Sequence, residues 1–474
     1  MKAPFLCCFL IISFFCFSQE KNMVGTWRGE FSIPSPFKGI RVLELPAEDI
    51  TFPLIFNIGY KNGVYKVVMH DPDNRSLNNV VRFLAEDSTA HVNMEGNRFK
   101  FSCKLVNDTL LEGSCSYLSF THPLKLIKQK ETFLFQRPQE PRPPFPYMEE
   151  QLSIKNVNDA DISIAYTFSY PKESQKLPAV ILVPGTGALD RDGTIAYHKM
   201  FYVVADYLNR NGIAVIRYDK RGVGKSSGVY DGGTIEELVT DVKSVFEFLK
   251  GRKEIDPNKI GFLGHSMGGG IAYSAAADLG DAAFVISLGT PGVSGEKHMY
   301  EQRKILLRSA NLSEKLIADN TKLLEGLVAV SRKYPQDFVM QHLDSISKTF
   351  LPDSLKNSSN DIRFVSGNLM ICYNPLYRSS LEFNPVECLR KVKCPVLVLN
   401  GEKDYVVDKV HAEKIGEALK KSGNNKVTVK TYPHLNHLFQ VCQTGSLQEY
   451  IWIEETMSPK VLEDILGWLD RVVE

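Results

Sequence analysis

Residues 264–268 combine residue types that support nucleophilic catalysis. They read Gly-His-Ser-Met-Gly, a G-x-S-x-G pattern, directly after the strand-like KIGFL and directly before a run of small residues that favours a helix. A serine on such a sharp strand-to-helix turn is exposed, and the two glycines avoid side chains that would collide there. We therefore predict Ser266 as a nucleophile and the backbone N–H of Met267 as a donor to an oxyanion. A glycine-rich turn with an inert serine is the alternative.

A serine nucleophile needs a base, and the base needs a carboxylate that orients it. On a strand–turn–helix scaffold the acid and then the histidine follow the serine, each at the end of a later strand. Asp404 follows the strand-like PVLVLNG and His437 follows VTVKTY, so we predict them as orienting acid and general base. Glu402 and Asp408 are alternatives for the acid, and His434 is the alternative for the base.

A second oxyanion donor is expected from the loop VPGTGALDRDG, which follows the strand-like AVILV. Its glycines let the backbone approach a substrate closely. Thr186 and Gly187 are the candidate donors, and the sequence leaves open which of them donates. For the charged residues 190–192 we predict ion pairs that shape this loop, in preference to direct contact with a substrate.

The segment Tyr218 to Ser226, YDKRGVGKS, ends like a phosphate-binding loop. That pattern requires a glycine at position 219, where Asp219 would repel a phosphate instead. A phosphate-binding loop also leads directly into its helix, whereas here no helical pattern begins before Thr234. The nucleotide-binding interpretation is therefore disfavoured.

Alternating strand-like and helix-like segments must position these residues. The strand-like segments are AVILV, IAVIRYD, KIGFLG, AFVISLG, PVLVLNG and VTVKTY. Residues 234–251, TIEELVTDVKSVFEFLKG, carry apolar residues at helical spacing. The alternation predicts an α/β domain over residues 148–474, with a mostly parallel, doubly wound sheet. It breaks at about residues 296–385, where charged helical sequence predicts a cap inserted over one end of the sheet.

The preceding region has a different pattern. Residues 19–137 contain short alternating runs, and two of them flank Asn62-Gly63, a strong signal for a β-hairpin. This region is predicted to be a small all-β barrel or sandwich domain. Five prolines in residues 138–147 predict an extended, semi-rigid linker between the two domains.

The first 18 residues have the pattern of a signal peptide: Lys2, a short apolar run and a small-x-small site before a cleavage after Ser18. We expect a secreted or periplasmic protein with no membrane span in its mature form. With 56 basic and 55 acidic residues, nucleic acid is not an expected partner. The scattered cysteines do not indicate a metal site, and no cofactor is expected; a disulfide between Cys103 and Cys115 stays open.

Taken together, these segments resemble the α/β-hydrolases, in particular secreted bacterial serine esterases and prolyl-oligopeptidase-like enzymes with a small N-terminal β domain. The resemblance is carried by RPQEPRPPFPY, LVPGTGALDRDG, RNGIAVIRYDKRGVGKSSG, IGFLGHSMGG and LNHLFQ. It implies an α/β-hydrolase fold, and it implies that DKRGVGKS is the D-x-R-G-x-G-x-S loop of that fold, with a structural role. Such relatives often carry Glu at the position of Met267.

The resemblance implies a serine hydrolase that cleaves short to medium acyl carboxylic esters through an acyl-enzyme. Two alternatives remain. The same three residues could serve a peptidase or aminoacyl hydrolase, which would act on short peptides. The chain could instead be a non-catalytic binding protein whose β domain captures a ligand. The oligomeric state does not follow from the sequence.

Overall fold

The computed structural model describes residues 24–33, 50–61, 64–70, 78–80, 82–84, 91–95, 99–117, 120–130, 136–172, 176–309 and 312–474. The chain divides into two compact units, the first comprising Met1–Ile40 and Leu45–Phe135, the second Arg41–Glu44 and Gln136–Glu474. The division after Phe135 lies close to the predicted domain boundary at residue 137. The predicted signal peptide, residues 1–18, lies outside the described residues.

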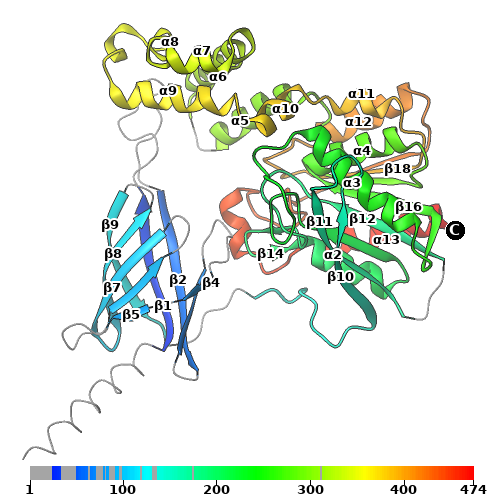
Figure 1. Cartoon of the computed structure of the whole chain (residues 1–474), viewed down its shortest axis with the longest axis horizontal. Coiled ribbons are helices and arrows are strands. Elements are labelled where there is room, and N and C mark those ends of the chain that lie inside the picture. Colours follow the sequence, from blue (N-terminus) through cyan, green and yellow to red (C-terminus); the bar gives the residue numbers. More distant parts are fainter. Residues whose placement is uncertain are drawn as a thin grey trace, which may run out of the picture. The chain divides into compact units, whose positions relative to one another are not determined.

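The described strands of the first unit form one antiparallel sheet, drawn in blue to cyan in Figure 1. Its order is β4-β3-β2-β1-β9-β8-β7-β6-β5, so most strands pair with their neighbours in sequence. The strands are β1 (Gly25–Ile33), β2 (Ile50–Lys61), β3 (Val64–His70), β4 (Asn78–Val80), β5 (Arg82–Leu84), β6 (His91–Glu95), β7 (Phe99–Asn107), β8 (Leu110–Tyr117) and β9 (Phe120–Lys128). Of the two predicted alternatives, the sandwich requires a second packed sheet, which these described strands do not form.

Local pairing in this unit follows the sequence pattern. Lys61 lies opposite Val64 in the antiparallel β2–β3 pair, as a two-residue hairpin turn requires, while Asn62 and Gly63 themselves lie outside the described residues. Cys103 and Cys115 are free, buried thiols. They do not face each other, because the register places Cys115 opposite Phe101.

The second unit is built on an eight-stranded sheet with the order β10-β11-β15-β12-β16-β17-β18-β19. At one edge of the sheet, β10 pairs antiparallel with β11, and β11 pairs antiparallel with β15. All the other neighbouring pairs, from β15–β12 to β18–β19, are parallel. The strands are β10 (Tyr147–Lys155), β11 (Ser163–Pro171), β12 (Leu177–Val183), β15 (Ala214–Tyr218), β16 (Ile255–His265), β17 (Val285–Leu288), β18 (Val396–Gly401) and β19 (Val427–Tyr432); a small hairpin comprises β13 (Thr194–Ile195) and β14 (His198–Lys199). The predicted mostly parallel sheet is confirmed.

Helices cover both faces of this sheet, because side chains of a strand alternate between its faces. In β12, Ile181 packs into a core with α3, α4 and α12, whereas Leu182 packs into a second core with α2 and α13. These helices are α2 (Met200–Arg210), α3 (Ile235–Lys250), α4 (Met267–Leu279), α12 (Val410–Lys421) and α13 (Pro459–Val473). Thr234 caps α3 in a reciprocal capping box with Glu237, which explains why the helical pattern begins there.

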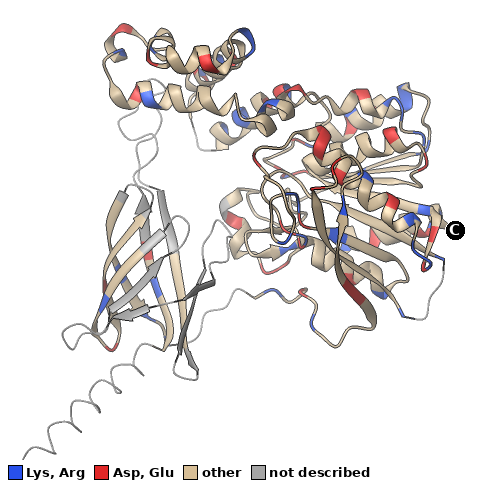
Figure 2. Cartoon of the chain, viewed as in Figure 1, with Lys and Arg blue, Asp and Glu red and all other residues tan. Residues whose placement is uncertain are grey.

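A helical insertion separates β17 from β18, as predicted (yellow-green to orange in Figure 1). Its helices are α5 (Gly295–Ser309), α6 (Glu314–Lys333), α7 (Gln336–Gln341), α8 (Leu343–Thr349), η1 (Asp353–Leu355), α9 (Ser359–Ile371), α10 (Pro375–Glu382) and α11 (Pro385–Leu389). Positive and negative residues are mingled along these helices, as Figure 2 shows. Among the residues that the structure describes, no helix is long and apolar enough to cross a membrane.

The proline-rich segment, predicted as a linker between the domains, belongs to the second unit and is bonded to its other loops. Arg137, just before it, donates hydrogen bonds to the carbonyl oxygens of Ile451 and Ile453 at 2.9 and 3.0 Å. Within the segment, the Gln139 side chain accepts hydrogen bonds from the N–H groups of Thr456 and Met457. The predicted linker is thus anchored at its start, since its polar side chains bind backbone groups of a distant loop.

Candidate active site

Ser266 lies at the turn between β16 and α4. Its backbone angles, φ 55° and ψ −127°, lie in a strained region for a residue with a side chain. A Cβ at Gly264 would collide with the carbonyl oxygen of Gly268, and one at Gly268 with that of Val183. The turn can therefore form only with glycine at both positions, as predicted from the G-x-S-x-G pattern. Since Met267 is the first residue of α4, its N–H has no acceptor within the helix and can bind a ligand.

Asp404 and His437 form a direct pair. The Nδ1 of His437 lies 2.7 Å from Oδ2 of Asp404, and both side chains are almost fully buried. The other oxygen of Asp404 accepts hydrogen bonds from the N–H groups of Val406 and Val407, each 2.8 Å long, which fix the carboxylate. A carboxylate acceptor at Nδ1 places the ring proton there, so Nε2 keeps its lone pair and can act as a base.

The alternative acid and base residues have other surroundings. Glu402 forms an exposed ion pair with Lys409, and Asp408 accepts a hydrogen bond from the N–H of Val410 at the start of α12. His434 is exposed in a turn, with φ 63°. None of these three side chains forms the buried acid–histidine contact that Asp404 makes.

The loop after β12 passes directly over Ser266. A Cβ at Gly185 would lie 3.0 Å from the Cβ of Ser266. The N–H of Gly187 already donates to the hydroxyl of Tyr230 at 2.9 Å. Gly187 is therefore the weaker of the two candidate donors, and Thr186, whose side chain is exposed, is the stronger.

Ion pairs hold this loop in place, as predicted for Arg191 and Asp192. Arg191 forms a bidentate ion pair with Asp219, and Asp192 pairs with Arg217. Asp190 differs, because its carboxylate accepts hydrogen bonds from Thr194. Burial raises the pKa of Asp219, but hydrogen bonds from Arg191 and a backbone N–H outweigh it and hold the pKa below its usual value. Asp219 thus serves as a structural anchor, and the loop 219–226 does not bind phosphate at a helix N-terminus, because α3 begins only at Ile235.

His265, directly before the predicted nucleophile Ser266, is a candidate site residue that was not predicted from the sequence. Its Nε2 lies 2.9 Å from the backbone carbonyl oxygen of His437, and the two rings are 4.6 Å apart. Burial, with the neighbouring His437, lowers the pKa of His265 to about 3, so the ring is neutral and donates from Nε2. Its position inside the G-x-S-x-G motif was the available signal.

Side chains of the helical insertion contact the loop that carries Asp404 and the start of the following helix, α12. Gln302 of α5 donates to the carbonyl oxygen of Val406 at 3.4 Å. Glu301, also of α5, lies 3.2 Å from Nε2 of the buried His411, whose Nδ1 accepts the N–H of Gly292. These partners lie far apart in sequence, and no local pattern announces them.

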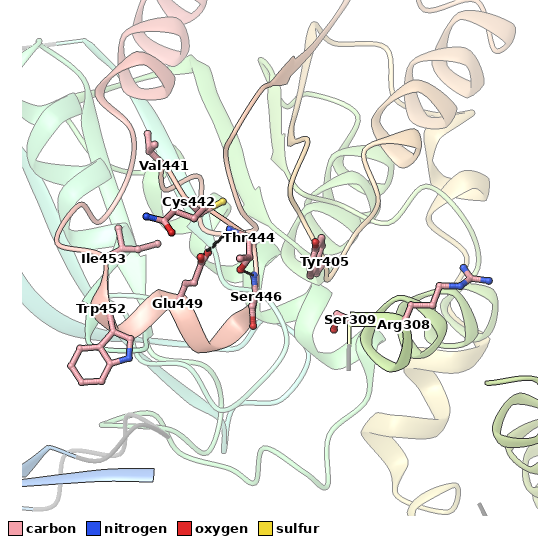
Figure 3. Close-up of a pocket in the computed structure, with 11 residues that line it drawn as sticks. Arg308, Ser309, Tyr405, Val441, Cys442, Thr444, Ser446, Glu449, Trp452 and Ile453 are labelled. Atoms are coloured by element: carbon pink, nitrogen blue, oxygen red, sulfur yellow. Dashed lines mark hydrogen bonds between the residues drawn. The ribbon is translucent and has the colours of Figure 1, made fainter. Parts of the chain in front are cut away.

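A pocket of about 1130 Å³ lies beside these loops, and Figure 3 shows the residues that line it. Its lining residues are Arg308, Ser309, Tyr405, Val441, Cys442, Gln443, Thr444, Ser446, Glu449, Trp452 and Ile453. Glu449 accepts the N–H of Thr444 and shapes one wall. Tyr405 directly follows Asp404, but none of the three predicted catalytic residues lines the pocket. In the described part of the chain, no cluster of three or more His, Cys, Asp or Glu side chains could hold a metal ion.

Two protein families match successive parts of the second unit. Residues 192–370 match the serine aminopeptidase family S33, and this range contains Ser266. Residues 365–473 match the prolyl oligopeptidase family, and this range contains Asp404 and His437.

Individual proteins are similar to part of this chain. Esterase EstD of Thermotoga maritima is 27% identical over 301 residues, which cover 63% of this chain and 63% of that esterase's own length. An uncharacterized 31.7 kDa protein of Escherichia coli, from the traX-finO intergenic region, is 26% identical over 51% of this chain and 78% of its own. The chain spans less than two thirds of the esterase.

Solved structures with a similar arrangement include esterases. The Pyrococcus furiosus esterase Pf2001 has a TM-score of 0.40 and 15% identity, covering 69% of this chain and 93% of that one. Est1E of Butyrivibrio proteoclasticus, solved with bound ferulic acid, has a TM-score of 0.40 and 17% identity over 68% of this chain and 99% of its own. With scores this low, the fold rests on the sheet topology and the family matches. On those grounds the chain is an α/β-hydrolase-fold protein, similar to esterases and to two families of serine peptidases.

Proposed function

We propose that this protein is a serine hydrolase that cleaves carboxylic esters of short to medium acyl chain through an acyl-enzyme. The observation that carries the proposal is the 2.7 Å contact between His437 and Asp404. Both follow strands that run parallel to β16, which ends at His265 directly before Ser266, so all three residues belong to the same edge of the sheet. The similarity to an esterase supports the choice of ester substrates.

In the proposed reaction, the Oγ of Ser266 forms a bond to the ester carbonyl carbon while its proton passes to Nε2 of His437. The carbonyl oxygen becomes an oxyanion, which the N–H groups of Met267 and Thr186 stabilise. The tetrahedral adduct then expels the alcohol, which takes the proton from His437. A water molecule attacks the acyl-enzyme by the same steps and releases the acid.

Hydrolysis of p-nitrophenyl esters of increasing acyl length tests this proposal. The Ser266→Ala variant should lose activity by roughly 10⁴-fold or more, because the nucleophile is gone. Ser422→Ala, a substitution at the end of α12, should keep wild-type rates. Wild-type turnover by Ser266→Ala would overturn the assignment, and the chain-length profile of the active protein would define its acyl preference.

A peptidase or aminoacyl hydrolase on the same three residues is the second candidate, and the matches to two peptidase families favour it specifically. Prolyl- and aminoacyl-nitroanilides belong in the same panel of substrates. Cleavage of nitroanilides without ester turnover would assign the protein to the peptidases. Failure of the wild-type protein to react with a fluorophosphonate would instead support a non-catalytic binding protein.

We also propose that the protein is exported, with cleavage after Ser18. The charged start, the short apolar run and the small-x-small site of residues 1–18 support this. Amino-terminal sequencing of the protein from its native host should begin at Gln19. A chain that keeps Met1 would contradict export by this signal.

A further inference from the structure

Lys220 is a buried ammonium group without a carboxylate partner. Its side chain is only 2% exposed, and among the described residues no carboxylate forms an ion pair with it. Its neighbours differ, because Asp219 pairs with Arg191 and Arg221 pairs with Asp241. Burial lowers the pKa of Lys220 to about 7. A buried cation is costly unless its donors are used, so its hydrogen bonds should indicate its role.

The two side-chain hydrogen bonds of Lys220 go to the loop that crosses Ser266. The Nζ donates to the carbonyl oxygen of Gly185 and to that of Gly187, the latter at 3.2 Å. It also lies 5.0 Å from the ring centre of Tyr230. One buried amine therefore fixes two carbonyl groups of the predicted oxyanion loop.

The geometry of the peptide bond gives this contact a consequence. In a trans peptide the C=O and the following N–H point in opposite directions. Because Lys220 binds the carbonyl of Gly185 from the buried side, the N–H of Thr186 is turned to the opposite, exposed side. A Cβ at Gly185 would lie only 3.0 Å from the Cβ of Ser266, so this N–H belongs to a peptide directly beside the predicted nucleophile.

Tyr230 fixes the next peptide in the same way. Its hydroxyl accepts the N–H of Gly187 at 2.9 Å, which removes that N–H from the set of available donors. Of the two candidate donors, Lys220 and Tyr230 together therefore leave the N–H of Thr186 available to an oxyanion.

We propose that Lys220 is a positioning residue of the oxyanion hole, which orients the N–H of Thr186 by binding the carbonyl oxygens of Gly185 and Gly187. The inference rests on the proposed serine hydrolase function. It goes beyond that function because it assigns a role to a residue that touches neither substrate nor reacting atoms.

Lys220→Met removes the two hydrogen bonds and keeps much of the side-chain volume. We expect kcat for p-nitrophenyl ester hydrolysis to fall about 100-fold, the usual effect of losing one oxyanion donor, with KM changed less than about threefold. Affinity for butylboronic acid should fall by a similar factor. Ser266 bonds to the boron of this inhibitor and its proton passes to His437, so the tetrahedral adduct carries its negative charge beside the oxyanion donors.

Two matched variants separate positioning from general damage. Lys220→Gln keeps side-chain N–H donors without the charge and should recover kcat about tenfold relative to Lys220→Met. Lys225→Met alters an exposed lysine of the same loop and should behave as wild type. The inference is overturned if Lys220→Met keeps wild-type kcat, if Lys220→Gln is no better than Lys220→Met, or if boronate affinity is unchanged while kcat falls.

If the proposed serine hydrolase function itself were wrong, the results would differ from those above. The wild-type protein would then be inactive on every substrate, or Ser266→Ala would be active. If Lys220→Met does not fold, the Tyr230→Phe variant still tests whether the orientation of the oxyanion loop controls kcat. It releases the N–H of Gly187 and leaves Lys220 intact, and we expect lower kcat at unchanged KM. Wild-type kcat in Tyr230→Phe would count against an oxyanion loop held by these two side chains.

Discussion

His265 donates a hydrogen bond from Nε2 to the backbone carbonyl oxygen of His437, 2.9 Å away. The residue that precedes the predicted nucleophile thus holds the loop that carries the predicted base. Because both histidines are buried and their rings lie 4.6 Å apart, a change at His265 should alter the placement of His437.

Replacing His265 with Leu should therefore lower kcat by about tenfold, since a small misplacement of a base is enough to slow proton transfer. His265→Gln keeps an N–H donor and should recover most of that loss. Steady-state kinetics on one p-nitrophenyl ester would measure both. Equal kcat for the two variants would show that the hydrogen bond does not matter.

Asp404→Asn should lower kcat by about 10⁴-fold and leave the fold intact, because an amide no longer holds the imidazole in the tautomer that accepts the serine proton. Asp408→Asn is the matched control. Its carboxylate accepts the N–H of Val410 at the start of α12, so activity should stay near wild type. A large loss in Asp408→Asn with little loss in Asp404→Asn would reverse the assignment of the acid.

Stability should decrease in acid because of buried neutral histidines. Burial lowers the pKa of His198 to about 4 and that of His265 to about 3. Between about pH 6.5 and those values the unfolded chain binds protons that the folded chain does not, so the free energy of unfolding falls as pH falls, by about 1.4 kcal/mol per pH unit for each group.

Denaturant unfolding at several pH values between 7 and 5 measures this slope. His198→Gln should reduce the slope, whereas Ser422→Ala, which removes no titratable group, should leave it unchanged. A slope that is the same in all three proteins would contradict the assignment.

Asp219→Asn should destabilise the second unit by roughly 3 kcal/mol, because it leaves Arg191 largely buried without its carboxylate. It should also lower activity, since the Arg191–Asp219 pair braces the loop that crosses Ser266. Thermal unfolding and ester hydrolysis would measure the two effects. Asp231→Asn, at an exposed position of the neighbouring turn, is the control and should change neither.

The sequence by itself determined the features that depend on neighbours along the chain. Strand and helix alternation predicted the parallel sheet, and the glycines around Ser266 predicted a turn that only glycine permits at those positions. The order of Ser266, Asp404 and His437 along the chain was readable because each follows a recognisable strand.

The tertiary structure decided what depends on contacts between distant segments. The sequence left Thr186 and Gly187 equal as donors, and the Tyr230 hydroxyl distinguishes them from 43 positions away. In the sequence, nothing distinguishes Lys220 from other charged loop residues. The structure shows that its Nζ donates hydrogen bonds to two carbonyl oxygens. The anchoring of Arg137 on residues 451 and 453 is equally invisible to local patterns. Local propensity depends on side chains within a few residues, whereas the direction of each N–H and the partner of each buried charge are fixed only when the packed sheet brings remote loops together.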